Sequence, residues 1–186
     1  KQDELPTESL LELKVDQERL ALAEKQLADL EALRKQKIQQ ARQQGAEAVP
    51  AQKWGIALAR IKGVGEETAW NLAHEFFGWR VFQNRREVGA ASGLVGSPYD
   101  SGDSRHEQGI SKAGNARVRH WMTELAWRWL QFQSQSALAK WYQRRFGSGS
   151  GRMRRIGIVA LARKLLIALW RYGTEGVLPE AAVLKA

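Results

Sequence analysis

The sequence predicts an all-α protein, in which a long N-terminal helix of coiled-coil character precedes a compact multi-helix domain. Three observations support this fold class. Residues 9–44 contain neither Pro nor Gly and are rich in Ala, Leu, Glu, Gln, Lys and Arg, the composition of a long exposed helix. In the remaining chain, apolar residues recur at helical spacing. No segment alternates for long with the two-residue period of a β-strand.

Length and composition predict two parts. A chain of 186 residues with 44% hydrophobic content and eight Trp can bury one substantial core. We therefore expect a helical extension over residues 1–50 and a compact domain over residues 51–186. The sequence has no Cys, which excludes disulfides and thiolate chemistry. It also has no apolar run of about 18 residues and no recognisable signal peptide, so we expect a cytoplasmic protein without a membrane partner.

Charge is distributed unevenly along the chain. The net charge is +9, but residues 1–50 hold 8 Lys/Arg against 10 Asp/Glu, a balance of −2, whereas residues 51–186 hold 21 against 10, a balance of +11. A polyanion would bind the second part. Charge alone does not distinguish nucleic acid from an anionic membrane surface or an acidic protein.

The first helix is expected to extend from about Ser9 to Gln44, with Ser9 as its cap and Gly45 and Pro50 as its stop signals. Arg34 and Lys37 interrupt its apolar heptad positions after barely three heptads. Those positions predict a spacer or dimerisation helix, and hence a homo-oligomer; the alternative is a single helix docked on its own domain. The residues of this heptad face are Leu13, Leu20, Ala23, Leu27 and Leu30.

A helix, a Gly-Val-Gly turn and a second helix are expected between Ile56 and Gly78. This pattern resembles the helix-hairpin-helix motif of DNA-binding proteins. Gly63 and Gly65 would allow the turn to direct amide N–H groups at a phosphate oxygen, and Lys62 would add positive charge. Such contacts carry no sequence information. The alternative is an ordinary corner between two helices.

The stretch from Gly93 to Arg119 combines hydroxyls, glycines and cations and contains almost no large apolar residue. Glycines permit tight turns that present N–H groups to an anion, and nearby cations match its charge. Ser101, followed by the small Gly102, is the candidate nucleophile for phosphoryl transfer. The alternative is a surface loop rich in small polar residues. The three His residues lack metal-ligand spacing, so no metal site is expected within this chain.

Further helices are expected over residues 84–91, from Asn115 onward, over 137–146 and over about 155–172, with a flexible joint at 148–151. The basic run of Arg152, Arg154 and Arg155 beside this joint is either a solvated flank or a phosphate clamp. Several tryptophans could stack on bases, although their helical spacing is more typical of core residues. These are Trp121, Trp127, Trp129 and Trp141.

Four motifs in order carry a family resemblance: Gly-Val-Gly-x-x-Thr-Ala at residues 63–69, Ser-Gly-Leu at 92–94, Ser-Gly at 101–102, and Gly-Ile-Ser-Lys-x-Gly-Asn at 109–115 with Arg119. This order resembles the C-terminal half of transposases of the insertion-sequence-110 family. The resemblance implies a DNA recombinase guided by a bridge RNA, in which Ser101 attacks the DNA phosphate. It also implies an RNase H-like half that binds Mg²⁺ through four acidic residues. This chain lacks that half, so no cofactor is expected in it.

The leading interpretation is thus the serine-bearing domain of a bacterial or archaeal, nucleoid-associated transposase that binds DNA and guide RNA. By itself, this chain should bind without recombining. Two alternatives stay open: a non-enzymatic helix-hairpin-helix DNA clamp, and an RNA-binding or assembly protein. Besides Ser101 as nucleophile, the predicted DNA and phosphate contacts are Lys62, Gly63, Gly65, Gly102, Arg105, Ser111, Lys112, Asn115, Arg119, Arg152, Arg154 and Arg155.

Overall fold

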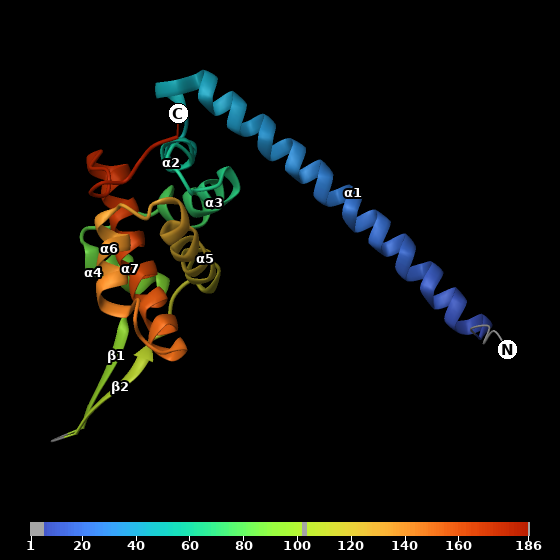
Figure 1. Cartoon of the computed structure of the whole chain (residues 1–186). Helices are drawn as coiled ribbons and strands as arrows, with labels where there is room; N and C mark the ends of the chain where they lie inside the picture. The colour runs from blue at the N-terminus through green and yellow to red at the C-terminus, as the bar shows by residue number, and fades with distance from the viewer. Residues whose placement is uncertain (1–5, 102–103, 186) are drawn as a thin grey trace. The chain divides into compact units, whose positions relative to one another are not determined.

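A computed structural model describes residues 6–101 and 104–185. The chain divides into two compact units, Lys1–Gly45 and Ala46–Ala186. Helix α1 (Thr7–Gln44) belongs to the first, which we call the N-terminal unit (Figure 1). The second, which we call the helical unit, contains a 3-10 turn (Gly45–Glu47, at the boundary), α2 (Pro50–Ala59), α3 (Glu66–Leu72) with a π-helical turn (Ala73–Phe77), α4 (Arg85–Ser92), β1 (Gly96–Ser101), β2 (Ser104–Ile110), α5 (Ala116–Phe132), α6 (Ala137–Phe146) and α7 (Gly151–Glu175).

The predicted all-α class is confirmed, and the first helix is close to its predicted bounds. Gly45 ends α1 with a positive φ of 55°, a conformation that glycine adopts without strain. The predicted cap at Ser9 is wrong. The helix begins at Thr7, directly after Pro6, so Ser9 lies within its first turn.

Helix α1 carries apolar residues on two faces. Leu13, Leu20 and Leu27 recur at seven residues, whereas Leu11, Leu22 and Leu33 recur at eleven. Because each residue advances about 100° around a helix, Leu20 and Leu22 point in nearly opposite directions. All six side chains are between 46% and 61% exposed. The helix therefore presents two separate apolar stripes, of which the heptad face was predicted and the second was not.

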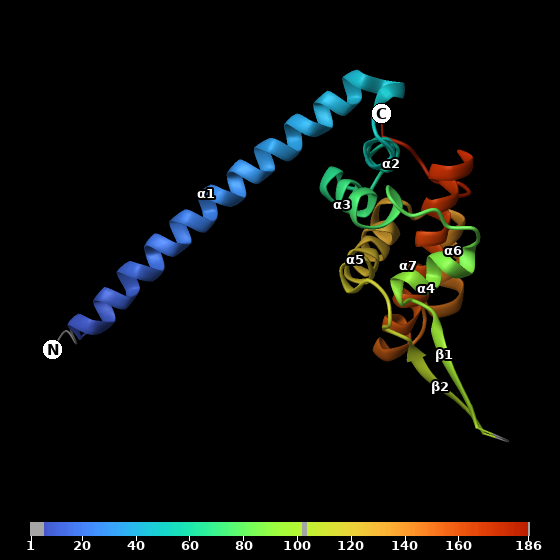
Figure 2. The same cartoon turned by 180° about the vertical axis from the view of Figure 1, so that it is seen from behind.

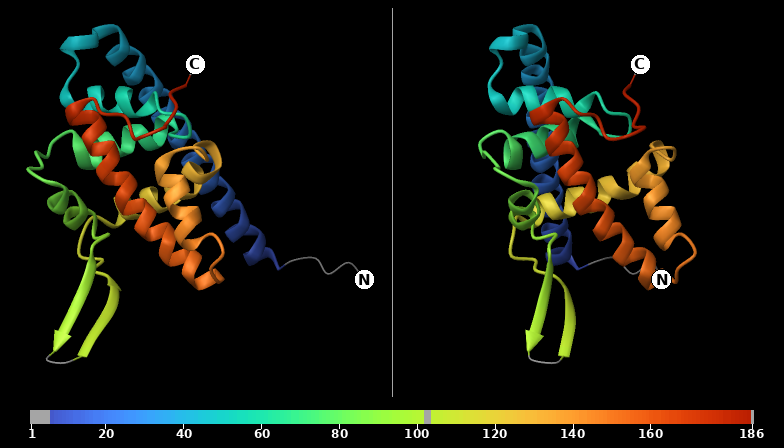
Figure 3. Two further views of the ribbon diagram at one scale, coloured as in Figure 1. Left: turned by 60° about the vertical axis from the view of Figure 1, so that its left-hand side comes forward. Right: turned by 90° about the vertical axis from the view of Figure 1, so that its left-hand side faces the viewer.

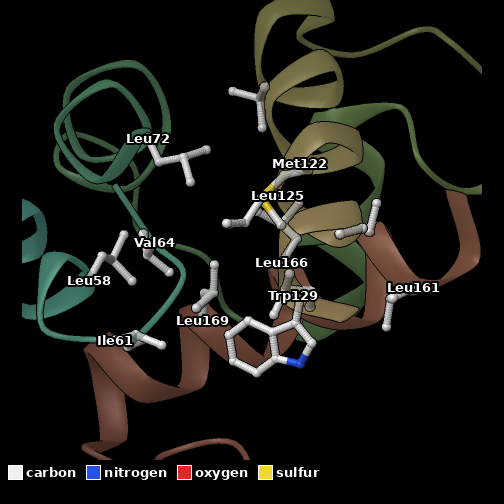
Figure 4. Close-up of a cluster of buried hydrophobic side chains, with 14 of the residues drawn as sticks. Leu58, Ile61, Val64, Leu72, Met122, Leu125, Trp129, Leu161, Leu166 and Leu169 are labelled. Carbon is white, nitrogen blue, oxygen red and sulfur yellow. The ribbon is translucent and has the colours of Figure 1, made fainter. Parts of the chain in front are cut away.

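Helix α7 is the central element of the helical unit and packs against α2, α4, α5 and α6. Figure 2 shows α4 and α7 from behind. The largest fully buried side chains come from α2, α3, α5 and α7 and from the turns beside them, and Figure 4 shows this core. Among them are Leu58, Ile61, Leu72, Met122, Leu125, Trp129, Leu161, Leu165 and Leu166.

The other helices lie where the sequence patterns predict them, but two boundaries differ. Helix α2 begins at Pro50, which was predicted as a stop signal, and not near Ile56, because Pro is well suited to the first position of a helix. Asn84 and Asn115 cap α4 and α5 through their side chains, and α6 spans Ala137–Phe146 as predicted. The start predicted for the last helix near residue 155 is wrong. The Ser150 side chain accepts a hydrogen bond from the Met153 N–H and starts α7 at Gly151. The predicted joint is therefore in part a helix cap.

The Ser- and Gly-rich stretch forms a two-stranded antiparallel β-hairpin, which the sequence pattern did not predict. Pro98 pairs with Glu107, and Ser101 pairs with Ser104 at the end of the ladder. The hairpin projects from the helices of its unit (Figure 3). Gly, Pro and Asp are depleted in strands, so the pattern carries little strand signal. Main-chain pairing between the two arms defines the strands instead.

Candidate nucleic-acid interface

The root of the β-hairpin is fastened to the end of α4 by main-chain hydrogen bonds. Gly93 ends α4 in the left-handed conformation, with φ 69°. The Ser111 N–H then donates to the Val95 carbonyl at 2.8 Å, and the Lys112 N–H donates to the Gly93 carbonyl at 3.3 Å. Ser111 and Lys112 are exposed, so this root presents a hydroxyl and an ammonium group at the surface.

Asn115 and Arg119, predicted as phosphate contacts, have internal partners. The Asn115 side-chain oxygen accepts from the Val118 N–H at 3.1 Å, and its amide group donates to Glu75 Oε1 at 3.1 Å. Arg119 Nη1 donates to the Ser92 carbonyl at 3.2 Å and to the Lys112 carbonyl at 3.3 Å. These contacts position the hairpin root and neutralise its carbonyls. A direct phosphate contact by either residue stays a prediction.

Gly114 lies too close to the end of α4 for any side chain. A Cβ at this position would overlap the Gly93 nitrogen and would come within 2.5 Å of the Ala91 carbonyl oxygen. Both obstacles are backbone atoms, which cannot rotate away. The absence of a side chain at Gly114 is therefore a condition for the observed hairpin root.

Gly114→Ala is expected to lower the free energy of unfolding by about 1–3 kcal/mol, because the loop must shift away from α4. Urea denaturation followed by circular dichroism measures the change. Gly151→Ala is the matched control, because a Cβ at Gly151 would meet nothing within 4 Å and its φ is not positive. An equal or larger loss in the control would show that close packing at Gly114 contributes little.

Ser101 is the last residue of β1 and lies at the far end of the hairpin from the root. Its register partner is Ser104, and the preceding pair is Asp100 with Arg105. Gly102 lies outside the described residues. Ser101 and Arg105 thus belong to the end of one hairpin, whereas Ser111, Lys112, Asn115 and Arg119 belong to its root.

The turn that contains Lys62, Gly63 and Gly65 joins α2 to α3. Gly63 has φ 89° and packs against Phe132, which a Cβ would meet at 3.0 Å. The Lys62 N–H donates to the Val183 carbonyl at 3.0 Å. Lys62 itself is exposed. The geometry is that of two helices joined by a glycine turn, and its use as a DNA-binding hairpin stays a prediction.

Two acidic residues bear on that prediction. Glu66 and Glu67 occupy the first turn of α3, beside the amide groups that would face a phosphate. Carboxylates at this position stabilise the helix N-terminus and oppose an incoming anion. The Gly-Val-Gly turn therefore has carboxylates as well as the Lys62 ammonium group beside it along the chain.

The predicted basic run lies in the first turns of α7. Arg152, Arg154 and Arg155 are all exposed, and Arg154 Nε donates to the Gly149 carbonyl at 3.2 Å. The Tyr142 hydroxyl donates to the Arg154 carbonyl at 3.3 Å. Burial raises the pKa of the Tyr142 phenol, and the positive charge of Arg154 partly opposes this shift. This run is separated along the chain from both the hairpin and the glycine turn.

A cavity of about 800 Å³ adjoins the hairpin root. Its lining includes Lys112, which was predicted as a phosphate contact. It also includes three cationic residues that were not predicted as contacts: Arg85, Arg163 and Lys164. Lys164 Nζ lies 4.7 Å from the centre of the Trp141 ring, which also lines the cavity. Of the tryptophans considered for base stacking, Trp129 is fully buried and Trp127 is 50% exposed.

Within residues 6–101 and 104–185, no group of three His, Asp or Glu side chains could hold a metal ion. No helix of the described chain combines the length and apolar character that crossing a membrane requires.

Comparison with known proteins relates part of the helical unit to transposases. Residues 56–143, from α2 through the hairpin to most of α6, match the family described as "Transposase IS116/IS110/IS902 family". The matched segment is thus an insertion-sequence-110-type transposase segment, which confirms the resemblance drawn from the motifs.

Two curated relatives agree with the assignment. The chain is 46% identical over 129 residues to "Putative transposase y4rJ" of Sinorhizobium fredii, covering 69% of this chain and 32% of the relative. It is 31% identical over 122 residues to "Transposase for insertion sequence element IS1328" of Yersinia enterocolitica, covering 64% and 35%. The chain spans about a third of the length of these relatives.

Proposed function

We propose that this chain is the DNA-binding, serine-bearing part of a transposase, and that Ser101 forms a covalent bond to DNA during strand exchange. One observation carries the proposal. The family match includes a hairpin that projects from a basic helical unit and places Ser101 at its far end. The end of the hairpin is separated along both strands from the root that joins it to the helices.

The proposed step is a transesterification. The Ser101 hydroxyl oxygen bonds to a backbone phosphorus, and the bond from that phosphorus to one bridging oxygen breaks. The displaced oxygen leaves as a free DNA hydroxyl, and the serine proton passes to a base or to solvent. No step of this proposal is assigned to a metal ion held by this chain. Any magnesium would be held by the RNase H-like part that the resemblance implies.

Covalent trapping tests this step. The complete transposase is incubated with end-labelled DNA, Mg²⁺ and guide RNA, and the products are separated on a denaturing gel. A labelled band at the mass of the protein supports the proposal. Absence of an adduct, with binding retained, would favour the non-enzymatic DNA clamp instead. Preference for structured RNA over duplex DNA would favour an RNA-binding protein.

DNA binding by this chain is expected to depend strongly on salt. The predicted contact set contains seven cations, of which Arg119 is held by two backbone carbonyls, so about six phosphates are neutralised. Release of about 0.9 counterion per phosphate gives a slope of roughly −5 for log affinity against log salt concentration. Fluorescence anisotropy at several salt concentrations measures this slope. A flat profile would contradict electrostatic binding.

We also propose that α1 associates with a second copy of the chain through its heptad face. Leu20 and Leu27 are each 59% exposed on this face, and water is an unfavourable environment for a continuous leucine stripe. Leu20→Lys with Leu27→Lys should dissociate the oligomer, because charges would be buried between the helices. Sedimentation velocity should then report a smaller mass.

The second stripe of α1 supplies the matched control. Leu11 and Leu22 are 61% and 57% exposed on the opposite face. Leu11→Lys with Leu22→Lys should leave the mass unchanged. The reverse result would assign the interface to this second face, and an unchanged mass in both variants would contradict self-association.

A further inference from the structure

The cavity beside the hairpin root is formed by four parts of the helical unit: the start of α4, the root of the hairpin, α6 and α7. Its volume of about 800 Å³ falls within the range of about 300–1,000 Å³ that is typical of small-molecule sites. Gly96 and Gly109, at the root of the two strands, form part of its wall. The cavity is therefore adjacent to the arm that carries Ser101.

The walls of the cavity are largely apolar. Leu94 is 2% exposed and belongs to the buried core, and Ile110, Trp141, Val159 and Ile167 pack against that core. Because these side chains pack against the buried core, the apolar surface they form exists before any ligand binds. A flat, apolar molecule could lie against it without requiring the core to rearrange.

Positive charge surrounds this apolar surface. Arg85 comes from α4, Lys112 from the hairpin root, and Arg163 and Lys164 from α7. None of the lining residues that the structure describes is acidic. Because these cations come from three elements, they can contact anionic groups on more than one side of a ligand. A single small anion would need only one or two of these cations.

We propose that this cavity receives one unstacked nucleotide of the bound nucleic acid, a role that rests on the proposed function above. The base lies against the apolar wall with Trp141, and the phosphates on either side of the nucleotide contact the cations. A nucleotide within a strand has a phosphate at both ends, which matches the distribution of positive charge. Aromatic and aliphatic surfaces bind unpaired bases with little dependence on their identity.

The test compares three DNA probes by fluorescence anisotropy with the full chain. The first is a fully paired duplex, the second carries one bulged nucleotide, and the third carries the same bulge without its base. Stacking of one base corresponds to a gain of about five- to 150-fold, so the bulged duplex should bind at least about fivefold more tightly than the other two. Equal affinity for the bulges with and without the base would overturn the proposal.

Two sets of variants locate the effect in the cavity. Ala160→Trp fills the cavity without changing charge, and it should remove the preference for the bulge while leaving affinity for paired duplex unchanged. Met153→Trp adds the same ring at an exposed position of α7 outside the cavity and should retain the preference. If Ala160→Trp fails to fold, Arg163→Ala is compared with Arg171→Ala, which removes an equal charge from α7 outside the cavity. Preference retained in Arg163→Ala would overturn the proposal.

The possible outcomes separate this inference from the proposed function. If the unsubstituted chain binds no DNA, the proposed function itself fails. If it binds paired duplex with the expected salt slope but shows no preference for the bulge, only the nucleotide site is wrong. If Ala160→Trp keeps the preference and loses self-association in sedimentation, the cavity instead receives a second copy of the chain.

Discussion

Ser101→Ala in the complete transposase is expected to abolish the covalent protein–DNA adduct and to change DNA binding by no more than about 1 kcal/mol. The substitution removes the oxygen atom that would bond to phosphorus, whereas one neutral hydrogen bond contributes only about 1 kcal/mol to binding. A denaturing gel with labelled DNA measures the adduct, and anisotropy measures the affinity. Ser101→Ala should therefore lose adduct formation while it retains DNA binding.

Ser104 is the sharpest control for that experiment, because it pairs with Ser101 across the hairpin. Ser104→Ala should retain the adduct, as should Ser97→Ala and Ser111→Ala. An adduct that persists in Ser101→Ala would show that another group attacks the phosphate. Loss of the adduct in Ser104→Ala alone would identify Ser104, on β2, as the nucleophile.

Trp129→Ala is expected to lower the free energy of unfolding by about 3–5 kcal/mol, the usual cost of deleting a large buried aromatic side chain. Trp129 is fully buried in α5, and its Nε1 donates to Ser136 Oγ at 2.8 Å. Ser136 in turn caps α6 by accepting from the Ala139 N–H at 3.2 Å. The substitution therefore opens a cavity and weakens the corner between α5 and α6.

Trp129→Phe separates these two contributions. It keeps most of the apolar volume and removes the hydrogen bond, so a loss of about 1–2 kcal/mol is expected. Urea unfolding of the full chain, followed by circular dichroism at 222 nm, measures both variants. A loss below about 1 kcal/mol in Trp129→Ala would show that the core closes around the deleted ring.

The helices were predictable because their signals are local. Asn84 and Asn115 were recognisable as helix starts, and Gly45 and Gly93 as helix ends, from residue types that act within one turn. The start of α7 was missed because Ser150 lies among glycines, whose composition resembles a linker. The β-hairpin was missed because its strands are defined by pairing across the turn and not by apolar alternation.

The candidate site was predictable only where it is contiguous in sequence. The order of the motifs singled out Ser101, Lys112 and Arg119 as site residues, but it could not show that Arg119 donates to carbonyls at the hairpin root. The cavity was missed altogether. Its cations Arg85 and Arg163 are 78 positions apart, and only the packing of α4 against α7 brings them to one place.

The β-hairpin has a consequence for how this protein can diversify. Six residues from Gly96 to Ser101, at about 3.3 Å each, give an arm of about 20 Å, longer than the width of about 12 Å of a DNA major groove. The backbone contact at Gly114 fixes only the root of this arm. The number and the chemical nature of the residues toward the end of the arm can therefore change without disturbing the core. Delivery of the hydroxyl to a target can then evolve separately from the stability of the scaffold.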